Sequence, residues 1–290
     1  MPSVDDYLAL LTLEAAKAPQ RLKRMLRGER PNEFYEEFFQ AHDHALYDRD
    51  PRVRARQAVV LDALSRHVVP GAAILDVGCG LGDVLAALPA SYRRYGVDYA
   101  AANVEYVARR LGGGADIRRG SATSNPFDDE SMDACLCLEV LEHLEDDAGA
   151  LAEIHRVLRP GGVLIAAVPY THYWPQYLRL MGHYRHYNRD SFGALLGSVG
   201  LRTVEHLPNY PRWHQALTRR YVWVRLQSLV GGRIAGTRDI YEFRWPWDAA
   251  PSMERAEAAL QTLKREDESL DYEREPTSTF VVAQKGGAPT

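Results

Sequence analysis

The fold is decided by one stretch, Ala73-Ile74-Leu75-Asp76-Val77-Gly78-Cys79-Gly80-Leu81-Gly82-Asp83. Residues suited to a buried strand lead directly into a turn in which every second residue is glycine, and the residues after it favour a helix. Such a turn leaves backbone N–H groups facing a cavity at the carboxyl end of the strand. In an open α/β sheet a nucleotide-like cofactor binds at this place, so the sequence predicts a cofactor site here.

Length and composition set limits on the class of protein. The 290 residues suffice for one large domain with additions, and 46% of them are hydrophobic, enough for a sizeable core. The net charge of −4 gives no basic surface for nucleic acid, so we expect no nucleic-acid partner. No apolar run long enough to span a membrane and no signal peptide are found, and the three cysteines form no disulfide framework. We therefore expect a cytoplasmic protein without a membrane span.

Strand and helix patterns alternate along the middle of the chain. Strands are expected at 73–77, 92–97, 116–119, 132–138, 163–168, 201–206 and 278–284. Helices are expected at 52–67, 84–88, 100–111, 147–158 and 190–199, and the Pro and Gly residues of 159–162 predict a turn. This alternation predicts an α/β fold with a seven-stranded, mostly parallel sheet that is covered by helices on both faces.

Three regions are predicted. Residues 1–55 are expected to form an N-terminal helical cap, and residues 56–206 with 277–285 the cofactor-binding domain. Residues 207–276 form an aromatic-rich insertion before the last strand, and they contain four of the five tryptophans. The insertion is interpreted either as a substrate cap or as a packing layer or dimer surface, and the protein as a monomer or homodimer.

Asp98 strengthens the prediction of a cofactor site. It ends the strand predicted at 92–97, where its carboxylate can accept hydrogen bonds from both hydroxyls of a ribose. The alternative is that it caps the helix predicted at 100–111. The glycine spacing, Gly-x-Gly-x-Gly, differs from the Gly-x-Gly-x-x-Gly of dinucleotide sites.

Four segments together carry a family resemblance. They are residues 74–82, residues 95–98, residues 125–133 before the strand at 132–138, and the Leu-Arg-Pro-Gly-Gly-Val-Leu of 158–164. In this order and spacing, residues 56–206 resemble a class I S-adenosylmethionine-dependent methyltransferase. The resemblance implies a Rossmann-like fold and S-adenosylmethionine as cofactor. The cofactor-binding residues that it implies are Asp76, Gly78, Cys79, Gly80, Asp98, Tyr99, Ser121, Ala122 and Glu139. The family often has an acidic residue where Ser121 stands, so the contact to the adenine amino group is left open.

A second group of residues, Glu139-Val140-Leu141-Glu142-His143, follows the strand predicted at 132–138. If this segment turns helically, its two carboxylates and its imidazole project to one side. One interpretation is that they maintain the fold or accept a proton. The other is a metal site, because Glu-x-x-Glu-His resembles the metal-binding segment of metal-dependent O-methyltransferases. The resemblance implies His183 as a fourth ligand, and Mg²⁺ or Mn²⁺ as the ion.

Glu142 and His143 are the candidate catalytic residues, either as proton acceptors or as metal ligands, and the alternative that they only maintain the fold stays open. Without a metal, His143 is the first candidate for a general base, since a neutral imidazole accepts a proton near pH 7. His183 or His186 is the second. Arg185 and Arg189 are candidates for holding an anionic or sugar substrate.

The predicted function is S-adenosylmethionine-dependent O-methylation of a small-molecule hydroxyl, with a saccharide or similar metabolite as the acceptor and a divalent metal as an assisting ion. Three alternatives stay open. They are metal-independent N-methylation of a small molecule, 2′-O-methylation of RNA, and a cofactor-binding scaffold that has lost catalysis. The net charge of −4 speaks against the RNA alternative.

Overall fold

The computed structural model describes residues 51–170, 183–207 and 278–286. The chain divides into two compact units, and nearly all described residues belong to the unit formed by residues 31–40, 56–209 and 277–290. Residues 1–50 of the predicted cap and 208–276 of the predicted insertion lie outside the described residues.

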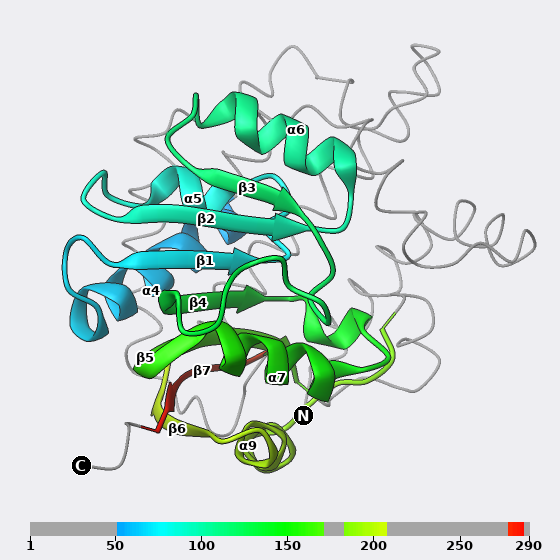
Figure 1. The fold of residues 1–290 in the computed structure, drawn as a ribbon. Helices are drawn as coiled ribbons and strands as arrows, with labels where there is room; N and C mark the ends of the chain where they lie inside the picture. Colours follow the sequence, from blue (N-terminus) through cyan, green and yellow to red (C-terminus); the bar gives the residue numbers. More distant parts are fainter. Residues whose placement is uncertain (1–50, 171–182, 208–277, 287–290) are drawn as a thin grey trace, which may run out of the picture. The chain divides into compact units, whose positions relative to one another are not determined.

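Within the described residues, seven strands form one sheet in the order β3-β2-β1-β4-β5-β7-β6 (Figure 1). Their bounds are β1 Ala73–Val77, β2 Arg93–Asp98, β3 Asp116–Arg119, β4 Met132–Leu138, β5 Leu158–Pro169, β6 Leu201–His206 and β7 Ser278–Lys285. The neighbours from β3 to β5 pair in parallel, and β7 runs antiparallel to both β5 and β6. The predicted seven-stranded, mostly parallel sheet is confirmed.

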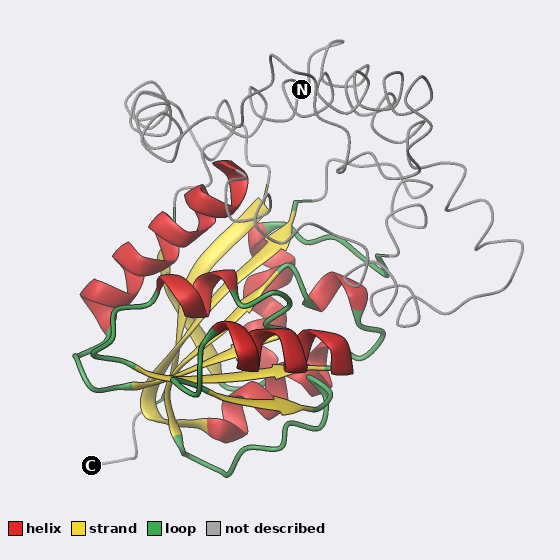
Figure 2. Ribbon diagram, turned by 90° about the horizontal axis from the view of Figure 1, so that it is seen from above, coloured by secondary structure: helices red, strands yellow, loops and turns green. Residues whose placement is uncertain are grey.

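The helices are α4 Pro51–His67, α5 Asp83–Ala87, α6 Ala101–Arg110, α7 Asp147–Val157 and α9 Arg189–Ser198, with a short 3₁₀ turn η1 at Leu141–His143. In Figure 1, α7 and α9 lie in front of the sheet, and α4 and α5 lie behind it. Figure 2 shows the same layers from above. This arrangement follows from right-handed crossovers, because the connections that run from β1 towards β3 and those that run from β4 towards β6 must cover opposite faces.

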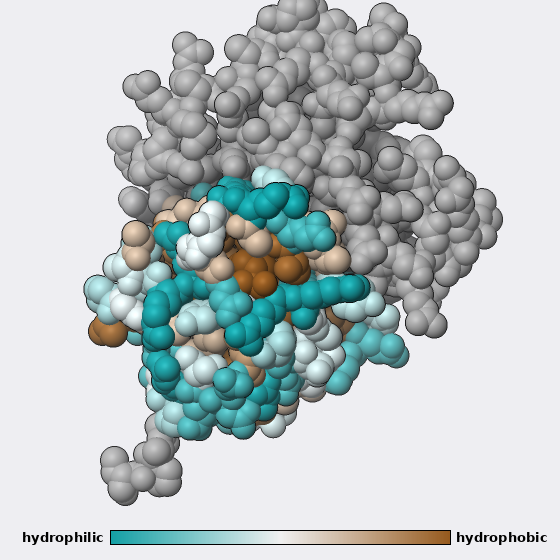
Figure 3. All heavy atoms as spheres, turned by 45° about the horizontal axis from the view of Figure 1, so that its top comes forward, coloured by the Kyte–Doolittle hydropathy of each residue, from teal (hydrophilic) through white to brown (hydrophobic). Residues whose placement is uncertain are grey.

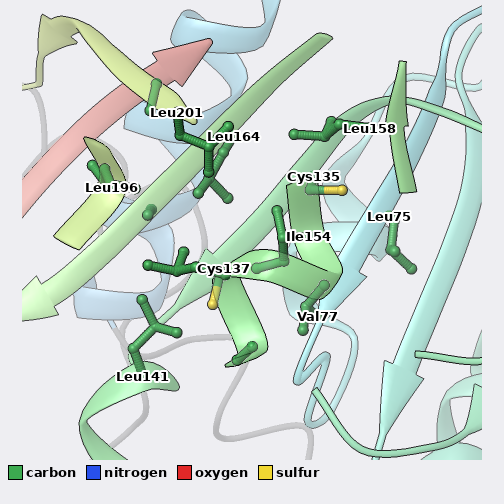
Figure 4. Close-up of a cluster of buried hydrophobic side chains, with 14 of the residues drawn as sticks. Leu75, Val77, Cys135, Cys137, Leu141, Ile154, Leu158, Leu164, Leu196 and Leu201 are labelled. Carbon is green, nitrogen blue, oxygen red and sulfur yellow. The ribbon is translucent and has the colours of Figure 1, made fainter. Parts of the chain in front are cut away.

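The core lies between the central strands and α7 (Figure 4). All five residues of β1 are buried, as expected for a strand covered on both faces. Leu75 and Val77 alternate along β1, as Cys135 and Cys137 do along β4, and this places them in one cluster with Ile154 of α7. Burial raises the pKa of both thiols, so these cysteines serve as small apolar side chains.

The predicted start of β5 is wrong. The strand begins at Leu158, and the predicted turn at 159–162 is an irregularity inside it, because Leu158 pairs with Met132 and Val163 with Ala134. Gly161 has φ +79°, and a Cβ on Gly162 would lie 3.0 Å from the Asp133 carbonyl oxygen. Pro and Gly here shape a bulge, which continues the strand at a shifted register. The other predicted elements are found with ends that differ by one residue or less.

The surface of the described residues is mainly hydrophilic on the face seen in Figure 3, with a small hydrophobic area near its middle. Among the described residues, no helix is long and apolar enough to cross a membrane.

Candidate active site

The site lies where the strand order reverses, between β1 and β4. In such sheets, ligands bind beyond the carboxyl ends of the strands at this point. The loop after β1 and the segment after β4 are in contact here, because a Cβ placed on Gly78 would lie only 2.6 Å from Cγ2 of Val140. Glycine at position 78 therefore allows the two loops to come together.

Two further glycines, Gly80 and Gly82, have positive φ angles of +52° and +68°, which favour glycine. The two glycines differ in the space available to a side chain. A Cβ on Gly82 would lie 2.7 Å from Cγ1 of Val107 in α6, whereas a Cβ on Gly80 would meet no atom of the described residues within 4 Å. The backbone at Gly80 therefore borders open space, as a cofactor-binding loop requires.

Asp98, at the end of β2, holds this loop. Its Oδ2 accepts a hydrogen bond from the Gly80 N–H (2.8 Å), and its Oδ1 accepts from the Ala100 N–H (2.9 Å) and from Nδ2 of Asn103 (3.0 Å). Burial raises the pKa of the Asp98 carboxyl, and these three donors oppose the rise. A carboxylate offers about four acceptor positions, and the described residues occupy three of those of Asp98. The ribose contact itself stays a prediction.

Acidic side chains surround the glycine loop. Asp76, in β1, is buried, and burial together with the nearby Asp83 carboxylate raises its pKa to about 8. Arg56 of α4 opposes this rise, and its Nη2 lies 3.4 Å from Oδ2 of Asp83. Gln57 also reaches the loop, since its Nε2 donates to the Asp83 carbonyl oxygen (2.8 Å).

Sequence reasoning missed Arg56 and Gln57, which lie in α4, outside the motifs on which it relied. The only available signal was that their helix immediately precedes the strand of the glycine loop. Cys79 was predicted to bind cofactor, and burial raises the pKa of its thiol well above the ordinary value. Its backbone N–H donates to the Val97 carbonyl oxygen (3.1 Å) and its carbonyl oxygen accepts from the Gly82 N–H (2.8 Å), so the predicted cofactor contact of Cys79 stays a prediction.

The remaining predicted cofactor residues follow β2 and β3. Tyr99 has an exposed fraction of 53%, and the Arg119 guanidinium lies 5.9 Å from the centre of its ring. The Ser121 hydroxyl is 2.8 Å from Oγ1 of Thr123, and Ala122 packs partly against the core. The structure therefore brings Tyr99 to the same edge of the sheet as Asp98, and the adenine contact of Ser121 and Ala122 stays a prediction.

The segment after β4 carries an unusual carboxyl group. Glu139 has φ +58°, a left-handed conformation that is costly for a side chain with a Cβ. Glu142 is 1% exposed, and neither of its carboxyl oxygens has a hydrogen-bond partner among the described residues. Burial, reinforced by the charge of Glu139, raises the pKa of Glu142 well above its ordinary value. A buried acid without partners is costly, and such groups are concentrated in functional sites.

Two histidines, His143 and His183, lie beside Glu142, and a third, His186, lies against His183. Nε2 of His143 is 3.8 Å from Oε1 of Glu142, and the ring of His183 meets that of His143 edge to face with centroids 4.5 Å apart. Nδ1 of His183 and Nε2 of His186 are 2.6 Å apart, a hydrogen-bonding distance. Burial, aided by His143, lowers the pKa of His186 to about 4, so this imidazole is neutral at pH 7.

One possible ligand atom from each of Glu142, His143 and His183 lies within 4.8 Å of the others, which is close enough for a single metal ion. These are three of the four predicted metal ligands. Glu139 is outside this group of described residues, although its charge acts on Glu142. The structure therefore brings three of the four predicted ligands close together, and the binding of an ion stays a prediction.

Arg185, one of the two arginines predicted to hold substrate, is engaged with the protein. Its Nη1 lies 2.5 Å from Oδ1 of Asp147, and its Nη2 donates to the Glu145 carbonyl oxygen (2.7 Å). Arg189 is the first residue of α9, and its role stays a prediction.

Comparison with known proteins agrees with this geometry. Residues 75–166, from β1 to β5, match a family model described as a methyltransferase domain. The chain is 38% identical over 117 residues to a probable S-adenosylmethionine-dependent methyltransferase of Mycolicibacterium smegmatis, covering 39% of this chain and 44% of that protein. It is 35% identical over 137 residues to the O-methyltransferase cnsE of Penicillium expansum, covering 43% of this chain and 50% of that protein.

The alignments thus span half the length of these curated relatives or less. A solved structure, a putative sarcosine dimethylglycine methyltransferase from Galdieria sulphuraria, has a TM-score of 0.56 at 18% identity, covering 80% of this chain and 86% of that one. At this identity, the likeness shows the fold.

Proposed function

Since this chain contains a class I S-adenosylmethionine-dependent methyltransferase domain, we propose that it transfers the methyl group of this cofactor to a hydroxyl of a small molecule. The observation that supports hydroxyl chemistry is the buried Glu142 carboxyl, which has no hydrogen-bond partner among the described residues and lies beside two histidines next to the glycine loop. Removal of a hydroxyl proton requires such a group, whereas a neutral amine needs none. The similarity to an O-methyltransferase supports the same choice.

The residues of the glycine loop fit S-adenosylmethionine. The open space at Gly80 would admit the cofactor, and the remaining acceptor position of Asp98 would bind a ribose hydroxyl. Asp83 would favour the positively charged sulfonium and ammonium groups, and these groups would in turn favour ionisation of Asp76, whose pKa burial raises to about 8. Arg56 would pair with the carboxylate of the cofactor. The cofactor supplies an electrophilic methyl group, and the protein has to align the acceptor behind it and exclude water.

We expect Gly80→Ala to weaken the binding of S-adenosylhomocysteine at least about tenfold, since the new methyl group would occupy the open space at this loop. The left-handed φ of +52° adds a loss of roughly 1–2 kcal/mol in the free energy of unfolding. Calorimetry of binding and chemical denaturation check the two effects. Gly161→Ala is the matched control, because this glycine also has a positive φ and open space but lies in the β5 bulge. Unchanged binding by Gly80→Ala would mean that the open space is not part of the cofactor site.

We propose further that Glu142, His143 and His183, with Glu139 nearby, hold a divalent metal ion. The donor set fits, because a buried carboxyl without partners and two imidazoles are ligands that gain from a cation. Mixed oxygen and nitrogen donors favour Mn²⁺ over Mg²⁺. When bound, such an ion lowers the pKa of a coordinated hydroxyl. A saccharide or similar polyol is our proposed acceptor, because neighbouring hydroxyls can bind one ion together.

The side chains also offer a route without a metal. His143 is partly exposed at this edge of the sheet and can take a proton from an acceptor hydroxyl. The His183 ring lies against it and in turn contacts the neutral His186. The three imidazoles would therefore stabilise a proton accepted by His143.

Removal of metal tests this choice between the two routes. We expect EDTA-treated protein to lose at least about 90% of its methyl transfer to a hydroxylated acceptor, and added Mn²⁺ to restore it, since the ion would generate the nucleophile. Added Mn²⁺ should not restore methyl transfer in the Glu142→Gln variant. Full activity in EDTA would exclude the metal and leave His143 as the base. The measurement is transfer of a labelled methyl group from S-adenosylmethionine.

A further inference from the structure

The first residue of α7, Asp147, carries a buried carboxylate outside the group of proposed metal ligands. Its Oδ2 accepts a hydrogen bond from the Tyr187 hydroxyl (2.7 Å), and its Oδ1 accepts from the Ala148 N–H (2.9 Å) and pairs with Arg185 (2.5 Å). One carboxylate thus holds two side chains of the segment 183–187. Tyr187 lies 40 residues after Asp147 in the chain, so this is a contact between distant parts of the sequence. Hydrogen bonds to an ionised group are among the stronger ones in proteins.

Backbone hydrogen bonds attach the same segment at two further points. The Tyr184 N–H donates to the Glu142 carbonyl oxygen (2.7 Å), and the Tyr187 N–H donates to the Pro169 carbonyl oxygen at the end of β5 (3.0 Å). The Tyr187 ring is buried and packs on Phe192 of α9, with ring centroids 5.4 Å apart. The segment is therefore held between η1, β5 and α7.

This segment carries His183 and His186, so its attachment decides where these imidazoles lie. His183 belongs to the group that could hold a metal ion, and His186 is its hydrogen-bonding neighbour. Neither histidine lies on a helix or strand, which could place its side chain by regular geometry. The contacts made by Asp147 replace that support. Groups that hydrogen-bond a metal ligand directly are typically worth about 10–100-fold in metal affinity, and Asp147 acts one step further from the ligands.

We propose that Asp147 is a positioning residue, which through Tyr187 and Arg185 holds the segment 183–187 so that His183 lies beside His143 and Glu142. The metal part of this inference rests on the proposed function. The placement of the segment does not. Asp147 acts through other residues, and no described contact joins it to Glu142, His143 or His183.

Two variants and one matched control test the proposal. Tyr187→Phe removes only the hydroxyl that binds Asp147 and keeps the ring on Phe192. Asp147→Asn removes the charge that pairs with Arg185. Asp146→Asn is the control, because Asp146 is the N-cap of the same helix, its side chain accepts from the Gly149 N–H, and asparagine caps equally well.

Three measurements on the full chain separate the possible outcomes. We expect Tyr187→Phe and Asp147→Asn to raise the Kd for Mn²⁺, measured by calorimetry, roughly tenfold or more. Amide hydrogen exchange in residues 183–187 should become faster by at least about tenfold, because opening of the segment becomes easier. The Kd for S-adenosylhomocysteine should stay within about twofold, and the control should change none of the three.

Unchanged exchange in both variants would overturn the proposal. So would an equal loss of S-adenosylhomocysteine affinity, since it would show a general disruption of the domain. If the unaltered protein does not bind Mn²⁺, the metal site of the proposed function fails, and the exchange measurement alone decides on Asp147. The two failures are thereby distinguished.

Discussion

Replacing His143 by alanine is expected to lower kcat for methyl transfer by about 1,000-fold or more while leaving the Kd for S-adenosylhomocysteine within about twofold. The imidazole lies at the carboxyl edge of the sheet, between Glu142 and His183. Both roles proposed for it, metal ligand and general base, are lost with the ring. Proton transfer by a positioned side chain is typically worth about 10²–10⁴-fold. Steady-state kinetics and calorimetry measure the two quantities.

A matched control for His143→Ala is His155→Ala. His155 lies in the last turn of α7, which ends where β5 begins, so it is at the opposite edge of the sheet from the proposed site. Its ring contacts Gly200, with Nε2 3.2 Å from the position of a Cβ there. We expect His155→Ala to alter the free energy of unfolding slightly and to change kcat by less than about twofold. Retained activity in His143→Ala would exclude both proposed roles.

Asp98→Ala is expected to raise the Kd for S-adenosylhomocysteine about 100-fold. The carboxylate holds the Gly80 N–H and the start of α6, and we propose that it also binds the ribose. Hydrogen bonds to a charged group are worth about 1.5–3 kcal/mol each. The loss of the one ribose hydrogen bond and of the one that holds the Gly80 N–H in the binding loop therefore corresponds to about 100-fold together. Calorimetry checks this value. Asp116→Ala is the control, because Asp116 is an acid at the start of the neighbouring strand β3 and pairs with Arg118 at the surface.

The ribose contact can be separated from the support of the loop. A 2′-deoxyribose analogue of S-adenosylhomocysteine should bind about tenfold more weakly than the parent compound to the unaltered protein. In Asp98→Ala, the two compounds should bind equally, because the group that distinguishes them is gone. If the ratio of the two Kd values is the same in the unaltered protein and in Asp98→Ala, Asp98 supports the loop and does not bind the ribose.

The sheet and the glycine loop were predictable because their signals are local. A buried strand that leads into Gly78-Cys79-Gly80, and an acid at the end of the next strand, are enough to predict the edge of the sheet at which we propose that the cofactor binds. The start of β5 was not predictable, since Pro160 and Gly161 look like a turn until pairing with β4 shows that they form a bulge.

The candidate site was predictable in part for a similar reason. Glu142 and His143 follow a strand directly, whereas Arg56 and Asp147 depend on contacts between elements that are distant in sequence. The buried state of Glu142 and its lack of partners could not be read from the sequence at all. An acidic residue in a short polar segment is ordinarily solvated, and only the packing of η1 against the sheet shows that this one is not.

The central claim is that Glu142, His143 and His183 activate a hydroxyl next to the cofactor. The most direct measurement is transfer of a labelled methyl group from S-adenosylmethionine to a panel of sugars, phenols, amines and RNA, with Mn²⁺ or with EDTA, followed by determination of the methylated atom by mass spectrometry and NMR. We predict label on an oxygen of a small molecule in Mn²⁺, and its loss in EDTA and in Glu142→Gln. Label on an amine nitrogen or on RNA, at the same rate in EDTA and in Glu142→Gln, would contradict the claim.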